Sequence, residues 1–425
     1  MDKYLTKIMT NLHAYFDKPT ILIDNAAKVA LVLSIFFTPL GTAPANVFLV
    51  ITVFLWLVAG GYKQRFKDLQ KNYFAWSTLA LYFLICIGGV YSSAESSEIK
   101  FQLVKYAKLL IILIGISLFK EKKWRDVGLN AFAISMLITL LLSLGSVFLT
   151  LPFIKGGDGN HYVFKDHIVQ NLMMSFFVLL MLIKSRGEVK KSMQIAYFSV
   201  AVFAAIDIIF FVQGRTGYVS LGLNIAIFVL FFISTRDRWI WIASIIFVIS
   251  SGLYFSDNFS GRLQLAVTEF QNQDSKELTS VGQRVEFFKK SVELIKERPV
   301  FGWGTGSYAK EFCRVAISPE WCQAGKFHPH NQFLAFGVQL GLFGVFCYFI
   351  FLGAAVQLAR QFYLPEKVLL IGLVGTLIVD SLLHAPLFLV TEAQFFILML
   401  GLLTAGNKIS GNNILIIKNK LRIHP

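Results

Sequence analysis

The chain contains a series of apolar segments, each about as long as a helix that crosses a bilayer. A span needs roughly 20 apolar residues to cross a hydrocarbon core of about 30 Å. With 56% hydrophobic and 15% charged residues, the chain cannot be soluble throughout. We therefore predict an all-α polytopic membrane protein of about twelve transmembrane helices. The predicted spans are residues 26–43, 45–61, 74–91, 102–119, 127–152, 168–184, 194–212, 217–233, 239–255, 332–359, 366–383 and 388–405.

The lysine and arginine distribution orients these spans. The segment before the first span is long and mixed, and no small-residue cleavage site follows it, so we expect the span to be retained and the N-terminus to be cytoplasmic. The predicted inner segments then carry 24 basic residues and the short outer loops only 4, as the positive-inside rule requires. The formal charge of +15 is thus a topology signal rather than a nucleic-acid signal, and both termini lie inside.

One connection differs from the others. Residues 256–331 form an outer loop with ten basic and nine acidic side chains, long enough to fold on its own. It divides the chain into spans one to nine (1–255), the loop (256–331), and spans ten to twelve with a tail (332–425). Within the loop, residues 284–298 place Val285, Phe288, Val292 and Ile295 at helical spacing, which predicts an amphipathic helix. Pro299 should end it.

Two further features of this loop bear on its chemistry. The turn of residues 302–307 has three alternating glycines but no preceding strand and no following Gly-Lys-Ser/Thr, so it does not predict a nucleotide site. Cys313 and Cys322 can form a disulfide if the outer side is oxidising, whereas Cys86 and Cys347 lie within spans and suit packing. No cysteine pair or outer Asp-x-Asp motif indicates a metal.

Polar residues are predicted to gather at the outer face. Arg215 follows the seventh span, Arg284 opens the amphipathic helix, and His330 stands at the start of span ten. Each also has a structural reading: a headgroup anchor, a solvated helix residue and a helix start, respectively. Residues of lower weight on the same face are Lys105, Lys108, Lys165, His167, His328 and Asn331.

These residue types suit one kind of reaction. The planar guanidinium of arginine binds phosphate through two hydrogen bonds and stays charged. A neutral histidine can take a proton from a hydroxyl. A diphosphate leaving group and a hydroxyl nucleophile fit both roles, and outside the cytoplasm the donor must arrive attached to lipid. No cofactor is expected.

The run His330-Asn331, nine residues, then Gly341-Leu342-Phe343-Gly344 resembles the signature of the O-antigen ligase and polymerase superfamily. Arg284, Arg298-Pro299 and the glycine turn are similar to the stretch before that histidine. The resemblance implies a bacterial inner-membrane glycosyltransferase with a periplasmic active face. It implies that His330 is the general base and that Arg215 and Arg284 bind diphosphate. It further implies metal-independent, inverting transfer of O-antigen polysaccharide from undecaprenyl diphosphate to a sugar hydroxyl of lipid A-core during lipopolysaccharide biosynthesis.

Three alternatives remain open. An O-antigen polymerase shares the donor but uses a second lipid-linked glycan as acceptor. A protein O-oligosaccharyltransferase belongs to the same superfamily. A lipid or solute transporter is the alternative of a different class, for which Asp207 and Asp380 inside spans are the candidate residues.

Overall fold

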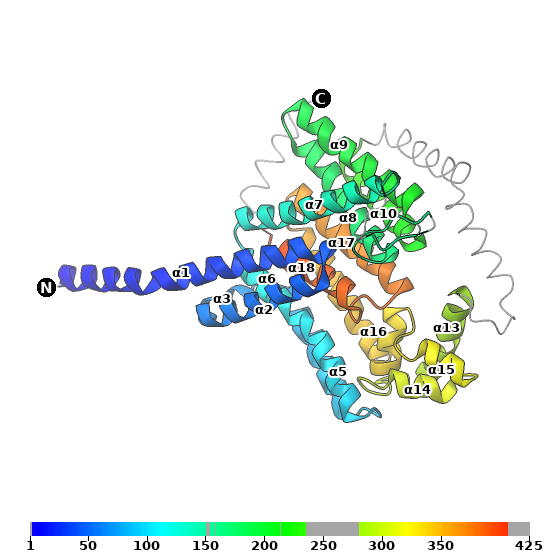
Figure 1. Cartoon of the computed structure of the whole chain (residues 1–425). Coiled ribbons are helices and arrows are strands. Elements are labelled where there is room, and N and C mark those ends of the chain that lie inside the picture. Colours follow the sequence, from blue (N-terminus) through cyan, green and yellow to red (C-terminus); the bar gives the residue numbers. More distant parts are fainter. Residues whose placement is uncertain (1, 150–153, 158, 213, 235–279, 407–425) are drawn as a thin grey trace.

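The structure is a computed structural model that describes residues 2–149, 154–157, 159–212, 214–234 and 280–406. Every regular element in these ranges is a helix (Figure 1). The elements are α1 (Asp2–Leu40), α2 (Thr42–Ala59), α3 (Tyr62–Gln70), α4 (Tyr73–Val90), α5 (Ser96–Tyr106), η1 (Ala107–Leu109), α6 (Leu110–Leu118), α7 (Lys122–Gly145), α8 (His167–Gly187), α9 (Lys191–Ile206), η2 (Asp207–Phe211), α10 (Arg215–Phe232), α13 (Ser280–Glu297), α14 (Tyr308–Val315), α15 (Pro319–Gly325), α16 (Gln332–Ala359), α17 (Leu364–Leu383) and α18 (Val390–Leu403).

The described helices agree with the predicted spans. Every predicted span within these ranges coincides with a helix or with consecutive helices. Nine stretches of described helix are long and apolar enough to cross a membrane. Helix α17, at the predicted span 366–383, is not among them, and α18 is a shorter apolar helix. The predicted span 239–255, residues 256–279 of the large loop and the tail beyond residue 406 lie outside the described residues. The described part of the chain is therefore an all-α polytopic membrane protein.

Three local features were not expected from the apolar runs. A polar helix, α3, occupies the loop after the second span. The fourth predicted span is divided by the 3₁₀ turn η1 into α5 and α6. The seventh ends in a π-helical turn, η2. Such irregular turns within helices often accompany functional sites, and η1 contains Lys108, one of the predicted site residues.

Helix α8 forms the centre of the bundle. Its apolar window is 83% buried, whereas that of α2 is 17% buried. Helices α9, α10 and α17 all contact α8, and α2 lies against α1 at the edge (Figure 1). The exposed side chains of α2 are mostly apolar, as expected for a helix that faces lipid.

The predicted inner segments meet at one end of the bundle. Asp24 forms ion pairs with Lys28 (3.1 Å) and with Arg65 (2.8 Å). Buried Arg125 of α7 pairs with Glu366 of α17 at 3.0 Å. These pairs connect segments that the topology assigns to the same side. The basic ends of these helices therefore lie together.

Helix α16 is not the single span that the sequence predicts. Gly341 has φ +68° and ψ −169°, and the chain reverses there. The rings of Phe333 and Phe349 lie 5.2 Å apart, and those of Phe336 and Tyr348 5.3 Å apart. Sixteen residues of straight helix would separate Phe333 from Phe349 by about 24 Å. The segment is therefore two helical arms, and only the arm after Gly341 is positioned to continue across the bundle.

The bend in α16 needs glycine. A Cβ on Gly341 would lie 2.2 Å from the backbone oxygen of Val300, in addition to the strained φ. A Cβ on Gly344 would lie 2.3 Å from Cβ of Leu340. The reversal places His330, just before the first arm, beside Phe287 of α13 and beside His384 at the end of α17.

Candidate active site

The described part of the large loop folds as a small helical cap. Cys313 of α14 and Cys322 of α15 are joined by a disulfide, one of the two states left open by the sequence. Cys86 and Cys347 are free and half-buried. Helix α13 packs on this pair of short helices and on α16 through a separate apolar cluster of Phe287, Leu294, Tyr308, Phe312, Trp321 and Val338.

The predicted face of the amphipathic helix is wrong by one position. Helix α13 ends at Glu297, close to Pro299 as predicted. Its fully buried side chains are Phe287, Ser291 and Leu294, while Phe288 is 54% exposed. The buried serine makes this stripe less apolar in the sequence than the predicted one. The correction matters because Phe287, not Phe288, faces the candidate site.

The glycine turn of residues 302–307 fastens the cap to the bend in α16. The amides of Trp303 and Gly304 donate to the carbonyl oxygens of Val338 (2.9 Å) and Gln339 (2.7 Å). The amide of Thr305 donates to Gly88 O of α4, and that of Gly306 donates to Oε1 of Gln339. These N–H groups are already used, so the turn is a structural joint and cannot cradle a phosphate.

His330 lies at the junction of the cap and the bundle. It is the one non-glycine residue with positive φ (50°) among the described residues, a conformation that is uncommon and concentrates at functional positions. Its ring is nearly parallel to that of Phe287 (centroids 5.9 Å apart, 14°). The His328 and His384 rings form T-shaped pairs with the His330 ring, with centroid distances of 4.3 and 5.9 Å. His330 Nδ1 is buried without a hydrogen-bond partner.

Burial, together with the neighbouring His328, His384 and Arg284, lowers the pKa of His330 to about 3. Burial also lowers the pKa of His328 to about 4, assisted by His384 and Lys105. Both imidazoles are therefore neutral near pH 7 and can accept protons. His328 also accepts a hydrogen bond at Nδ1 from the backbone N–H of His330 (3.2 Å), which helps to hold the turn.

Arg284 lies within electrostatic range of His330. It stands three residues before Phe287 on α13, so both side chains share one helix face. Phe287 is against the His330 ring, and the positive charge of Arg284 contributes to the low pKa of that ring. The structure thus brings together two of the three principal residues predicted from the sequence.

Arg215 is placed by the packing of α10 on α17. The two helices are antiparallel: Lys367 lies 5.1 Å from the Phe231 ring at one end, and Asn224 donates to Thr376 at 3.0 Å further along. Arg215 is nine residues before Asn224, and His384 is eight after Thr376. At 1.5 Å per residue these offsets are about 13 and 12 Å, so Arg215 and His384 lie at about the same depth.

The glycines around Arg215 have a structural role. A Cβ on Gly217 would lie 2.5 Å from Cβ of Asn171, and one on Gly214 would lie 2.9 Å from its amide nitrogen. These glycines allow close packing of α10 on α8. His167, at the start of α8, lies beside Gly214, and its ring centroid is 5.8 Å from that of Tyr162.

The remaining predicted residues have separate places in the structure. Lys105 lies over the rings of Phe388 (3.6 Å) and Phe101 (4.6 Å), and its charge acts on His328. Lys108 is half-buried in η1. Asn331 caps α16 by accepting from the Leu334 N–H and donates to Leu382 O, which is a structural role. Lys165 lines a different cavity, described below.

Sequence reasoning missed His384. It follows α17, is buried, and its Nδ1 lies 3.0 Å from Oδ1 of Asp380. Its ring meets that of His330. The spacing of Asp380 and His384, four residues apart at a helix end, is a usable signal for such a pair. Asp380 and Asp207, the candidate residues for a transporter, therefore have partners within the protein. Asp380 pairs with His384, and Asp207 accepts a hydrogen bond from Ser143 at 2.6 Å. Within the described ranges, no group of three His, Cys, Asp or Glu side chains is arranged to hold a metal ion.

Comparison with known proteins places this site in a family. A family model described as O-antigen ligase matches residues 200–349, a range that includes Arg215, Arg284, His330 and Gly341–Gly344. Over these residues the resemblance predicted from the motif is confirmed, and this part of the chain is similar to the O-antigen ligase family. No curated protein matches the chain. The match indicates a glycan-transferring enzyme of the ligase and polymerase type, acting on lipid-linked polysaccharide, within a multi-pass membrane protein.

Proposed function

We propose that the chain is an O-antigen ligase of the bacterial inner membrane. It transfers polysaccharide from undecaprenyl diphosphate to a sugar hydroxyl of lipid A-core at the periplasmic face, without a metal ion and with inversion at the anomeric carbon. The observation that carries the proposal is the His330 imidazole, uncharged, fixed against Phe287 and within range of Arg284. A proton acceptor beside a phosphate-binding cation suits this reaction.

In the proposed step, His330 takes the proton of the acceptor hydroxyl as its oxygen attacks the anomeric carbon from the face opposite the diphosphate. The new carbon–oxygen bond forms as the bond to diphosphate oxygen breaks. Undecaprenyl diphosphate leaves with the electron pair, and Arg215 and Arg284 stabilise its charge. The proton on His330 is then released to solvent or to the departing diphosphate, which returns the imidazole to its neutral state.

The low pKa of His330 has a consequence for the order of binding. A group with a pKa of about 3 is a weak base, because general bases work best with a pKa near the operating pH. Diphosphate on Arg284 would cancel the positive field that lowers this pKa and add a negative one. Donor binding would therefore strengthen His330 as a base, so we expect the donor to bind before proton transfer.

His384 has a positioning role in this proposal. Asp380 fixes the Nδ1 atom of His384, and the His384 ring packs against the His330 ring, with the ring centroids 5.9 Å apart. The pair thus holds the imidazole in a strained backbone conformation without touching substrate. Its loss should change the orientation and the pKa of His330 together.

The test is a transfer assay with purified full-length protein, lipid-linked polysaccharide and a chelator. Separate reactions contain lipid A-core, a second lipid-linked glycan, or an acceptor peptide. Product on lipid A-core alone supports the ligase; product on the second glycan or the peptide identifies the polymerase or the protein transferase instead. Movement of lipid across proteoliposomes without any new glycosidic bond would identify a transporter and contradict the proposal.

The catalytic assignment is tested in the same assay. His330→Ala should lower product formation about 10²- to 10⁴-fold, so most of the lipid-linked donor stays unconsumed. His161→Ala is a matched control, because this histidine also lies beyond the spans but pairs with Ser146 instead (2.9 Å). Wild-type product from a folded His330→Ala protein would remove the general-base role.

A further inference from the structure

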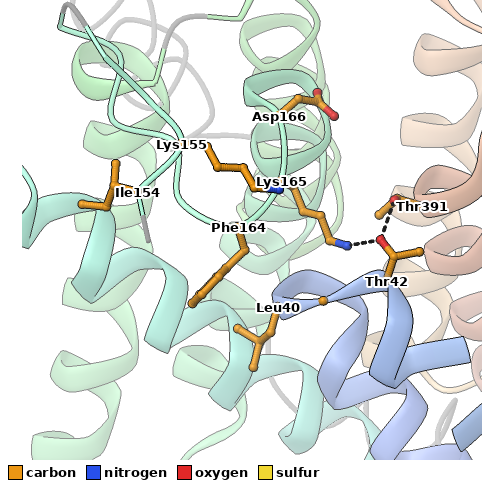
Figure 2. A pocket seen from close by; sticks show the side chains of 9 residues that line it. Leu40, Thr42, Ile154, Lys155, Phe164, Lys165, Asp166 and Thr391 are labelled. Carbon is orange, nitrogen blue, oxygen red and sulfur yellow. Dashed lines mark hydrogen bonds between the residues drawn. The ribbon is translucent and has the colours of Figure 1, made fainter. Parts of the chain in front are cut away.

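A cavity of about 610 Å³ lies apart from the residues around His330. It is bounded by the turn between α1 and α2, the described part of the connection between α7 and α8, and the start of α18 (Figure 2). Its polar lining is Lys155, Lys165, Asp166, Thr42 and Thr391, and its apolar lining includes Leu40, Ile154 and Phe164. A cavity of this size can hold a small ligand.

Lys165 is the distinctive residue of this cavity. It is 8% exposed, and its Nζ donates to Oγ1 of Thr42 at 2.6 Å. No carboxylate of the described residues lies within ion-pair distance of it. In Figure 2 the Lys165 side chain extends toward Thr42, whereas the Asp166 carboxylate points away. Asp166 and Glu392 act on its charge from beyond ion-pair distance. A buried ammonium group is costly unless it is closely paired, so an anionic ligand in the cavity would stabilise Lys165.

The surroundings of Lys165 favour the same ligand. Thr42 and Thr391 lie 3.4 Å apart at their Oγ1 atoms, so the N-termini of α2 and α18 meet here. Neither helix is capped by a side chain, so both dipoles direct positive potential at the cavity. Glu392, in the first turn of α18, opposes part of this potential. Lys155 adds a second ammonium group. Two ammonium groups and two hydroxyls form a site for phosphate oxygens.

We propose that this cavity binds a phosphate ester carried by a membrane lipid, with the phosphate at Lys155, Lys165, Thr42 and Thr391 and the adjoining apolar part against Leu40, Ile154 and Phe164. The lipid is a phosphorylated glycolipid or an anionic phospholipid, which share this chemistry. The site is separate from the diphosphate site proposed at Arg215 and Arg284, and its existence does not depend on the reaction at His330.

The test is a binding measurement without donor, using purified full-length protein in zwitterionic detergent and native mass spectrometry. The probes are diphosphorylated lipid A, lipid A with both phosphates removed, phosphatidylglycerol and phosphatidylcholine. Preference for both phosphorylated lipids would define a general lipid-phosphate site, and preference for lipid A alone would define a glycolipid site; either supports the proposal. Equal binding of phosphorylated and dephosphorylated lipid A would overturn it.

Variants locate the binding. Lys155→Met with Lys165→Met should weaken binding of phosphorylated lipid about 10- to 100-fold, the effect of losing hydrogen bonds to a charged group. Lys100→Met with Lys296→Met is the matched control, since both lysines are exposed and lie outside this cavity. Lys165→Arg should retain binding. If the double variant does not fold, Lys155→Met alone tests the site, because Lys155 is exposed. Unchanged affinity for phosphorylated lipid in a folded variant would refute the site.

The lipid-phosphate site and the proposed transfer reaction can be refuted independently. His330→Ala should bind phosphorylated lipid like the wild type, because His330 does not line the cavity. Normal lipid binding with no transfer to lipid A-core would refute the proposed function alone. Transfer without phosphate-dependent binding would refute this inference alone.

Discussion

Two polar regions of this bundle differ in charge: the one around His330 is neutral, and the one around Lys165 is cationic. Around His330, aromatic and imidazole rings enclose the base and keep it neutral. Around Lys165, the cavity is open enough for a ligand, and burial lowers the pKa of this lysine only to about 8. The first region is suited to accepting a proton, and the second to holding an anion.

The difference follows from what packs on each residue. Phe287 and the buried stripe of α13 close one side of His330. Lys165 instead donates a hydrogen bond to the Thr42 hydroxyl, where the N-termini of α2 and α18 lie together. Because the neutral region and the cationic region are separate, one outer face can hold phosphate and perform proton transfer without mutual neutralisation.

The largest expected effect separates the two regions directly. His330→Ala should lower the rate of glycan transfer about 10²- to 10⁴-fold, the usual contribution of general-base catalysis. The Lys155→Met/Lys165→Met protein should instead raise the lipid A-core concentration needed for half-maximal transfer if lipid A is the bound lipid. Steady-state kinetics on both proteins measure the contrast. Equal losses in kcat for the two proteins would show that the regions act as one site.

The second prediction concerns guanidinium geometry. Arg284→Lys and Arg215→Lys should each reduce transfer about 10²-fold although the charge is kept, because lysine cannot form two parallel hydrogen bonds to phosphate. Arg298→Lys is the control: this arginine lies over the Trp303 ring at 4.1 Å and has no proposed ligand role. Full activity in either arginine variant would assign that residue to anchoring instead.

The sequence predicts the spans well because burial in lipid demands long apolar runs. It does not predict the reversal at Gly341, because glycine within an apolar run is compatible with a continuous helix. The reversal depends on distant partners: the Leu342 amide donates to Pro299 O at 2.8 Å. Periodicity likewise failed to choose between Phe287 and Phe288 on α13, because the buried stripe includes Ser291.

For the candidate site, residue chemistry pointed to His330 and the arginines, and their roles stay predictions. The structure adds the neighbours that residue type alone cannot supply. His384 stands in an apolar stretch, and its significance emerges only when the end of α17 meets the first arm of α16. Lys165, predicted as part of the same cluster, is assigned to a separate cavity because the connection between α7 and α8 packs on Thr42.

The third prediction uses the neutral state of His330. Its pKa is lowered to about 3, so the proton-accepting form persists as the pH falls. At pH 5.5 an ordinary histidine would be only about one-tenth neutral, but we expect kcat/KM to remain near its value at pH 7. Arg284→Gln should move the acid limb to higher pH, since one positive neighbour is removed. An acid limb near pH 6.5 in the wild type would contradict the enclosed, neutral base.

The fourth prediction concerns the pair that supports the base. His384→Gln should reduce transfer about tenfold, less than the 10²- to 10⁴-fold contribution of a general base itself, and should raise the pKa of His330 because the electrostatic contribution of His384 is lost. The measurement is the pH profile of kcat/KM, which a purely structural defect would lower without shifting. An unshifted profile would therefore leave His384 as a packing residue.

The smallest expected effect belongs to the open cavity. Burial and Lys155 lower the pKa of Lys165 to about 8, while Asp166 and Glu392 oppose that shift. Bound phosphate favours the ammonium form, so affinity should fall as the pH rises through this pKa. From pH 7.0 to pH 8.5 the protonated fraction falls about fourfold, and binding of phosphorylated lipid should weaken by the same factor. Lys165→Arg stays charged throughout and should remove the dependence; an identical decline in that variant would place the titrating group elsewhere.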